Sequence, residues 1–139
     1  MPDVSALRRH EPWHHSTDEQ VGERWRGAPE ADELAICDQV RLEILCSVRS
    51  ATDYGALAAE LSLHLIPTTA ETFERALEVQ GRLARVGGLH HRSVKIADLV
   101  IAAAAETAGA VVWHYDRDYD RIAAVTHQPV EWIAPPGSL

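Results

Sequence analysis

The sequence feature that most constrains the fold is a strongly apolar stretch at residues 94–108, in which Asp98 is the only charged residue between positions 96 and 105. A helix that is apolar nearly all round its circumference must be buried between a sheet and neighbouring helices. A buried carboxylate costs roughly several kcal/mol unless it is stabilised. We therefore expect Asp98 to be held by the helix N-terminus, by a nearby arginine or by a metal ion.

The remaining segments alternate between short apolar runs and helical patterns. An i, i+4, i+8 stripe of Val40, Ile44 and Val48 predicts a helix with Asp38 as its N-cap, and Gly109 is expected to end the apolar helix as its C′ residue. Strands are expected at 33–37, 63–66, 110–113 and 130–133, and further helices at 17–26, 51–61, 71–85 and 119–124. This alternation predicts an α/β fold with a short parallel sheet of four to five strands and helices on both faces.

Length and composition predict one domain. The chain has 139 residues, of which 46% are hydrophobic, so a single compact domain is expected over residues 1–134 with a short C-terminal tail at 135–139. The sequence contains no apolar run long enough to cross a membrane and no apparent signal peptide, so we expect a cytoplasmic protein. Two cysteines, Cys37 and Cys46, are too few for a disulfide framework, and we expect small buried thiols.

Charge argues against a large nucleic-acid footprint but leaves room for a local one. The formal net charge is −8, whereas proteins that bind nucleic acids through phosphate contacts are usually basic. A cluster of Arg82, Arg85, Arg92 and Lys95, the last being the only lysine of the chain, lies directly before the apolar helix. Most of its members are expected to be ordinary solvated residues.

Other carboxylates lie where a site could form. Glu43 borders the buried face of its predicted helix, although a solvated glutamate could occupy the same position. Asp116, Asp118 and Asp120 follow a predicted strand within five residues, and they repel one another unless a cation or arginine neutralises them. We expect Asp120 to cap the following helix, which leaves Asp116 and then Asp118 as the better ligand candidates.

Four motifs, taken together, resemble the PIN-domain toxins of the VapC type. Residues 3–7 (DVSAL) resemble their opening D-x-S-A-L motif, and residues 40–45 (VRLEIL) resemble their second acidic motif. Residues 96–103 (IADLVIAA) are similar to D-L-L-I-A-A, and residues 114–123 (HYDRDYDRIA) are similar to the fourth motif. Each motif alone is weak, but four in order over a chain of this length are specific, and they imply a PIN-like three-layer fold.

The resemblance implies a metal-dependent ribonuclease. Its catalytic carboxylates would be Asp3, Glu43, Asp98 and Asp116, with Asp3, Asp98 and Asp116 as metal ligands. Glu43 would bind metal through water or orient the nucleophile. An all-oxygen ligand set suits Mg²⁺ or Mn²⁺ better than Zn²⁺.

The resemblance also implies supporting residues and partners. Ser5 and Asp118 would have supporting roles, and Arg92 and Lys95 are the best candidates for contacts with RNA. Proteins of this type are typically homodimers, and a small VapB-like antitoxin holds them inactive. The expected function is therefore RNA cleavage by the toxin of a toxin–antitoxin pair.

Three alternatives compete with this function. Only Met1 and Pro2 precede Asp3, where relatives have a full strand, so a catalytically degenerate PIN fold that binds an antitoxin or RNA is the main rival. A receiver domain would need a lysine after a late strand, and no lysine follows Lys95. A zinc site built from the His pairs and the two cysteines lacks the usual ligand spacing.

Overall fold

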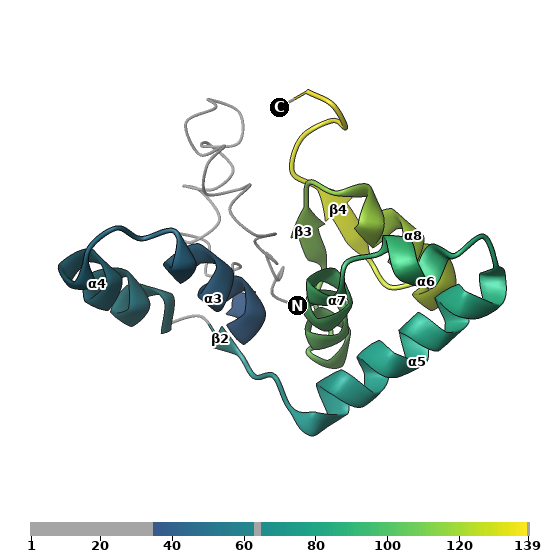
Figure 1. The fold of residues 1–139 in the computed structure, drawn as a ribbon, viewed down its shortest axis with the longest axis horizontal. Helices are drawn as coiled ribbons and strands as arrows, with labels where there is room; N and C mark the ends of the chain where they lie inside the picture. The colour runs from purple at the N-terminus through teal and green to yellow at the C-terminus, as the bar shows by residue number, and fades with distance from the viewer. Residues whose placement is uncertain (1–34, 63–64, 139) are drawn as a thin grey trace.

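The computed structural model describes residues 35–62 and 65–138, and within them strands and helices alternate (Figure 1). The elements are, in order, β1 (Ile36–Cys37), α3 (Asp38–Cys46), α4 (Ala51–Leu61), β2 (Leu65–Ile66), α5 (Ala70–Val86), α6 (His90–Ser93), α7 (Ile96–Thr107), β3 (Val112–His114), α8 (Arg117–Thr126) and β4 (Val130–Trp132). The strands form two parallel pairs, β1 with β2 and β3 with β4. The predicted α/β class with parallel strands is confirmed, and the part of the chain described holds four strands.

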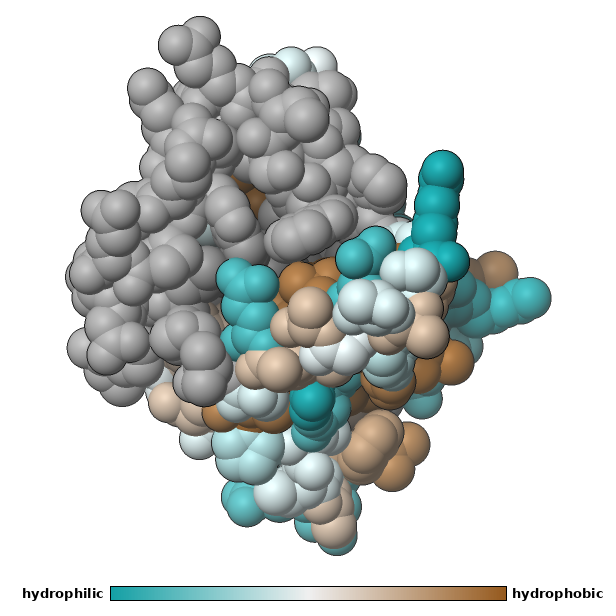
Figure 2. Space-filling model, turned by 90° about the vertical axis from the view of Figure 1, so that its left-hand side faces the viewer, coloured by the Kyte–Doolittle hydropathy of each residue, from teal (hydrophilic) through white to brown (hydrophobic). Residues whose placement is uncertain are grey.

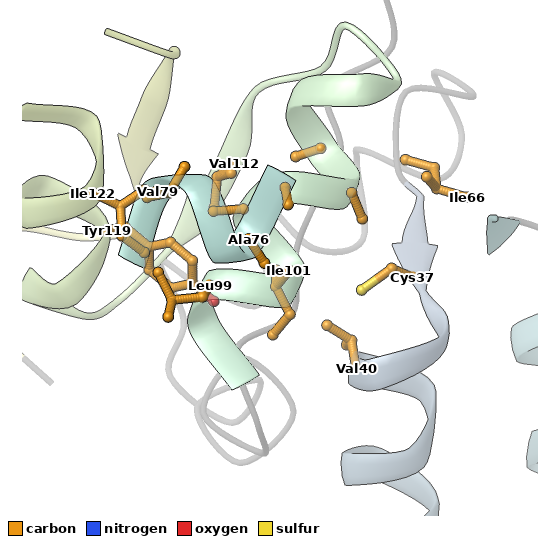
Figure 3. Packing of buried hydrophobic residues seen from close by; sticks show 14 of the residues in the cluster. Cys37, Val40, Ile66, Ala76, Val79, Leu99, Ile101, Val112, Tyr119 and Ile122 are labelled. Carbon is orange, nitrogen blue, oxygen red and sulfur yellow. The ribbon is translucent and has the colours of Figure 1, made fainter. Parts of the chain in front are cut away.

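Helix α7 lies at the centre of the fold, as its composition requires. Residues 98–105 are all buried, and α7 contacts α3, α5 and α8 (Figure 1). The core around it combines Ile101 of α7 with Val40 of α3, Val79 of α5 and Val112 of β3 (Figure 3). Burial of this apolar surface is the main force that fixes α7 against its neighbours.

Helix α5 is the longest helix described, and it is amphipathic. Its start is fixed by a capping box, in which Thr69 Oγ1 accepts from the Thr72 N–H and Thr72 Oγ1 accepts from the Thr69 N–H. Val79 and Leu83 face the core, and the Arg75 guanidinium forms an ion pair with Glu106 at the end of α7. These contacts set the position of α7 along α5.

The predicted apolar helix begins later than expected. Residues 90–93 form the separate short helix α6, and α7 starts only at Ile96. Leu89, just before α6, has a left-handed φ of 60°, and Val94 and Lys95 are extended, so the helical conformation of α6 does not continue into α7. Gly109 has a φ of 66°, as expected of a C′ residue.

Helix α3 also differs from its prediction at both ends. Cys37, not Asp38, is the N-cap, and Asp38 lies in the first turn, where its negative charge still suits the helix dipole. Val48 lies beyond the end of α3, although Val40 and Ile44 are fully buried as the stripe predicts. Helix α4 has the predicted bounds, and the predicted helix at 17–26 lies outside the described residues.

The side of the molecule that carries α4 is shown in Figure 2, where hydrophilic and hydrophobic residues are interspersed. No residue of α4 is buried, but Leu57 and Leu61 pack against the core.

None of the helices within residues 35–62 and 65–138 is long and apolar enough to cross a membrane.

Candidate metal centre

Two helix starts and one strand end meet at the candidate site. Asp98 lies in the first turn of α7, and Asp116 follows β3 as the N-cap of α8, whose first turn contains Asp118. The carboxyl ends of parallel strands are where sites form in such folds. The N-terminal ends of α7 and α8 also carry partial positive charge toward these side chains.

The three carboxylates converge, and we call Asp98, Asp116 and Asp118 the acidic triad. One oxygen from each lies within 4.8 Å of the others. Asp118, which the sequence suggested only as a supporting residue, thus lies as close as the two predicted ligands. Among the described residues, no group of three that includes a histidine or cysteine converges in this way.

Asp98 is fully buried, and Tyr119 supports it. The Tyr119 hydroxyl donates a hydrogen bond to Asp98 Oδ1 over 3.2 Å, and the Tyr119 side chain is itself buried. The Asp98 N–H donates to the Lys95 carbonyl oxygen at 3.1 Å, which closes the first turn of α7. Tyr119 was not singled out from the sequence, although it lies one residue after Asp118.

The start of α8 corrects one prediction about the HYDRDYD segment. Asp116 Oδ1, rather than Asp120, caps the helix by accepting from the Asp118 N–H at 2.8 Å. The helix therefore begins at Arg117, earlier than expected, and its first turn already includes both later aspartates. Asp120 is exposed and accepts from the Trp132 indole N–H instead.

Two cations contact the acidic triad. Lys95 Nζ lies 2.8 Å from Asp116 Oδ2 and 3.3 Å from Asp118 Oδ2, and Arg121 donates to Asp118 Oδ1 at 3.1 Å. The Lys95 backbone N–H also donates to Asp118 Oδ2 at 3.2 Å. Burial lowers the pKa of Lys95, but hydrogen bonds and the negative charges of Asp116 and Asp118 outweigh it, so the net pKa is raised. Lys95 is therefore a charged ammonium at neutral pH.

His114 holds the backbone of Asp116, one member of the triad, in place. It is fully buried at the end of β3, and its Nδ1 accepts a hydrogen bond from the Asp116 N–H at 3.1 Å. Its ring packs against Tyr119 and Trp132 at centroid distances of 4.9 and 4.8 Å. The sequence alone gave no signal for this role, because it depends on how β3, α8 and β4 pack.

A cleft of about 430 Å³ opens beside the triad. Asp116 and Asp118 form part of its wall, together with the cationic side chains of Arg117 and Arg121. Tyr115 and Trp132 add aromatic surface, and Pro136 and Gly137 of the predicted C-terminal tail complete the lining. The cleft is thus a polar opening with acidic, basic and aromatic walls.

The other predicted site residues lie elsewhere or outside the described part. Glu43 is half-buried on α3, where its Oε1 accepts from Gln39 Nε2 at 3.3 Å, and it is not in the converging group. Arg92 is exposed on α6. Asp3 and Ser5 lie outside the described residues. The predicted roles of these residues stay predictions.

Relatives with similar sequences are VapC proteins. The chain is 64% identical to Ribonuclease VapC18 of Mycobacterium tuberculosis over 128 residues, which cover 91% of this chain and 93% of that protein. It is 46% identical to Ribonuclease VapC21 of the same organism over 107 residues, 76% of each chain.

Solved structures share the fold. A structure of DNA-bound VapBC from Salmonella typhimurium superposes with a TM-score of 0.71 at 16% identity, over 96% of this chain and 100% of that one. VapBC2 from Rickettsia felis, bound to a DNA fragment from its promoter, gives a TM-score of 0.68 at 15% identity, over 95% and 98% of the two chains. A sequence model described as "PIN domain" matches residues 3–125. The chain therefore belongs to the PIN-domain family and, within it, to the VapC proteins.

Proposed function

We propose that this protein is a ribonuclease that cleaves RNA phosphodiester bonds with a bound Mg²⁺ or Mn²⁺ and acts in the cytoplasm as the toxin of a toxin–antitoxin pair. The observation that carries the proposal is the convergence of Asp98, Asp116 and Asp118 within 4.8 Å of one another. High identity to Ribonuclease VapC18 over most of both chains supports the same activity here.

The donor chemistry of the triad fits a hard divalent cation. All three residues offer carboxylate oxygens, and Asp98 and Asp118 are buried, so their mutual repulsion demands positive charge nearby. The Lys95 ammonium already bridges Asp116 and Asp118, which indicates that a cation is accommodated at these oxygens. Asp98, Asp116 and Asp118 would hold the ion, and Asp3 is predicted to join them.

When bound, such an ion supplies a Lewis acid for the phosphate and lowers the pKa of a bound water. The chain's own residues orient the acceptors. Tyr119 fixes one oxygen of Asp98, and the cap of α8 fixes one oxygen of Asp116. Glu43 is proposed to act through water or on the nucleophile, and Ser5 to support the carboxylates. Carboxylates that are already held in place need less reorganisation during the reaction.

RNA must be held locally, because the chain carries a net charge of −8. Arg117 and Arg121 line the cleft beside the triad, where their guanidinium groups suit phosphate oxygens. Tyr115 and Trp132 offer aromatic surfaces on which an unpaired base can stack. Arg92 and Lys95 stay proposed RNA contacts, although the Lys95 ammonium is engaged by the triad here.

A homodimer inhibited by a small VapB-like antitoxin is also proposed. An apolar groove of about 200 Å³ runs between α5 and α7, and Phe73, Leu77 and Ile96 are 53%, 67% and 73% exposed there. Helix α5 carries acidic residues near its start and arginines near its end, so two antiparallel copies would place opposite charges together. The groove is therefore the proposed contact between two copies of the chain.

Cleavage of a mixed RNA pool by the purified protein tests the activity. We expect cleavage with Mg²⁺ or Mn²⁺, none with chelator, and a loss of roughly 100-fold or more in Asp116→Asn. Asp53→Asn is the matched control, because Asp53 is an exposed aspartate in the first turn of α4. Cleavage that survives both the chelator and Asp116→Asn would overturn the metal-dependent mechanism. No cleavage, with antitoxin binding retained, would favour the degenerate PIN fold instead.

A further inference from the structure

We propose that Lys95 is a built-in counter-ion of the acidic triad. A divalent ion must displace the Lys95 ammonium from Asp116 and Asp118 before it can bind to all three carboxylates. The inference rests on the proposed metal site. It adds that Lys95 lowers the affinity of the site for the divalent ion.

The first step is the position of the ammonium. Lys95 is the N-cap of α7, and its backbone is held because the Asp98 and Leu99 N–H groups both donate to its carbonyl oxygen. Its Nζ reaches the Oδ2 atoms of Asp116 and Asp118 at 2.8 and 3.3 Å. The ammonium is thus fixed at the triad by the same turn that places Asp98.

The second step is that the two oxygens of Asp116, and likewise of Asp118, have different side-chain or backbone partners. The Oδ1 atoms have structural partners: the Tyr119 hydroxyl for Asp98, the Asp118 N–H for Asp116 and the Arg121 guanidinium for Asp118. The Oδ2 atoms of Asp116 and Asp118 instead accept from Lys95. Displacement of the ammonium would remove one donor from each of these two oxygens, and Asp118 Oδ2 would keep the Lys95 backbone N–H, while the Oδ1 contacts hold both carboxylates in place.

The third step is charge. Among the described residues, the acidic triad is contacted by two cations, Lys95 and Arg121, so a divalent ion that entered at the same oxygens would lie within a few ångströms of the Lys95 ammonium. An ammonium and a metal ion that compete for the same oxygens repel each other. The Lys95 side chain is 35% exposed on a flexible stem, so it can move toward water. Displacement is therefore the expected result of metal binding.

Metal binding by variants tests the inference without relying on activity. Lys95→Met keeps the length of the stem and removes the charge, and we expect it to bind Mn²⁺ roughly tenfold more tightly than the wild type in calorimetry. Arg49→Met is the charge-matched control, because Arg49 is exposed in the loop between α3 and α4, and the affinity of this variant should equal that of the wild type. Lys95→Arg should stay close to the wild type. Equal or weaker Mn²⁺ binding by Lys95→Met would overturn the inference.

A measurement on the wild-type chain covers the case in which Lys95→Met does not fold. Because Lys95 is the only lysine, ¹³C-lysine labelling gives one set of side-chain NMR signals. On addition of Mg²⁺ the Cε signal should move toward the position of a free lysine and sharpen. An unchanged lysine signal during metal binding that calorimetry detects would refute the displacement but leave the proposed ribonuclease intact. Absence of metal binding in both the wild type and Lys95→Met would contradict both proposals.

Discussion

The hydroxyl of Tyr119 can be removed without removing its ring, which makes Tyr119→Phe a direct probe of how Asp98 is stabilised. The hydroxyl donates to Asp98 Oδ1 at 3.2 Å, and both side chains are fully buried. Phenylalanine keeps the ring that packs against His114, so the substitution creates almost no cavity. The change therefore removes a buried hydrogen bond to a carboxylate and leaves the ring packing in place.

The size of the effect follows from the type of hydrogen bond. A hydrogen bond to a charged group contributes about 1.5–3 kcal/mol, whereas a bond between neutral groups contributes about 0.5–1.5 kcal/mol. We expect Tyr119→Phe to lower the free energy of unfolding by about 2 kcal/mol in metal-free buffer. For a chain of this size, that loss lowers Tm by roughly 6–10 °C.

Urea denaturation with chelator at neutral pH measures the loss. Tyr54→Phe is the matched control, because Tyr54 lies on α4 and is 46% exposed, and its stability should stay within about 0.5 kcal/mol of the wild type. In an Asp98→Asn background, Tyr119→Phe should cost less, because the acceptor is then neutral. A loss below about 0.5 kcal/mol in the wild-type background, or an equal loss with and without the Asp98 carboxylate, would refute the reasoning.

Three further results are expected. Burial raises the pKa of the Cys37 thiol, so a thiol reagent should modify only the exposed Cys46 in the native protein and both cysteines in urea, and fast native labelling of Cys46→Ser would contradict this. Leu77→Glu places a charge in the groove between α5 and α7 and should convert a dimer to a monomer in light scattering, whereas an unchanged mass would exclude this face as the contact. Arg121→Gln should weaken binding to uncleaved RNA several-fold and reduce the salt slope of log K by about 1, and an unchanged slope would remove Arg121 from the proposed RNA contacts.

The elements with strong local signals could be predicted from the sequence. Helix α4 has its predicted bounds, and the apolar composition of α7 predicts its central place. The separate helix α6 could not be predicted, because it begins after Leu89, whose left-handed conformation is rare for that residue type. Val94 is apolar and is buried in the structure, and its apolar character extended the predicted helix too far toward the N-terminus.

The site shows the same division. Asp98 stood out because a lone carboxylate in an apolar helix requires stabilisation. The three aspartates at alternate positions indicated a charged segment, but the sequence did not show which of them caps α8, since that depends on where the helix begins. Lys95 lies 21 residues before Asp116 in the sequence, so its contact with the triad follows only from the packing of two helix starts. Local patterns identify the elements, whereas the partners of each carboxylate depend on tertiary structure.

An acidic chain can still hold RNA at such a site, because the relevant charge is local. The N-terminal ends of α7 and α8 carry partial positive charge toward the triad, and Arg117 and Arg121 stand on the adjoining wall of the cleft. The chain as a whole, at a formal net charge of −8, repels RNA that is not seated there. Binding would then require an RNA segment that enters the cleft, with a phosphate near the triad and a base against Trp132. The aromatic wall of the cleft therefore favours single-stranded segments, since paired bases are not free to stack on a side chain.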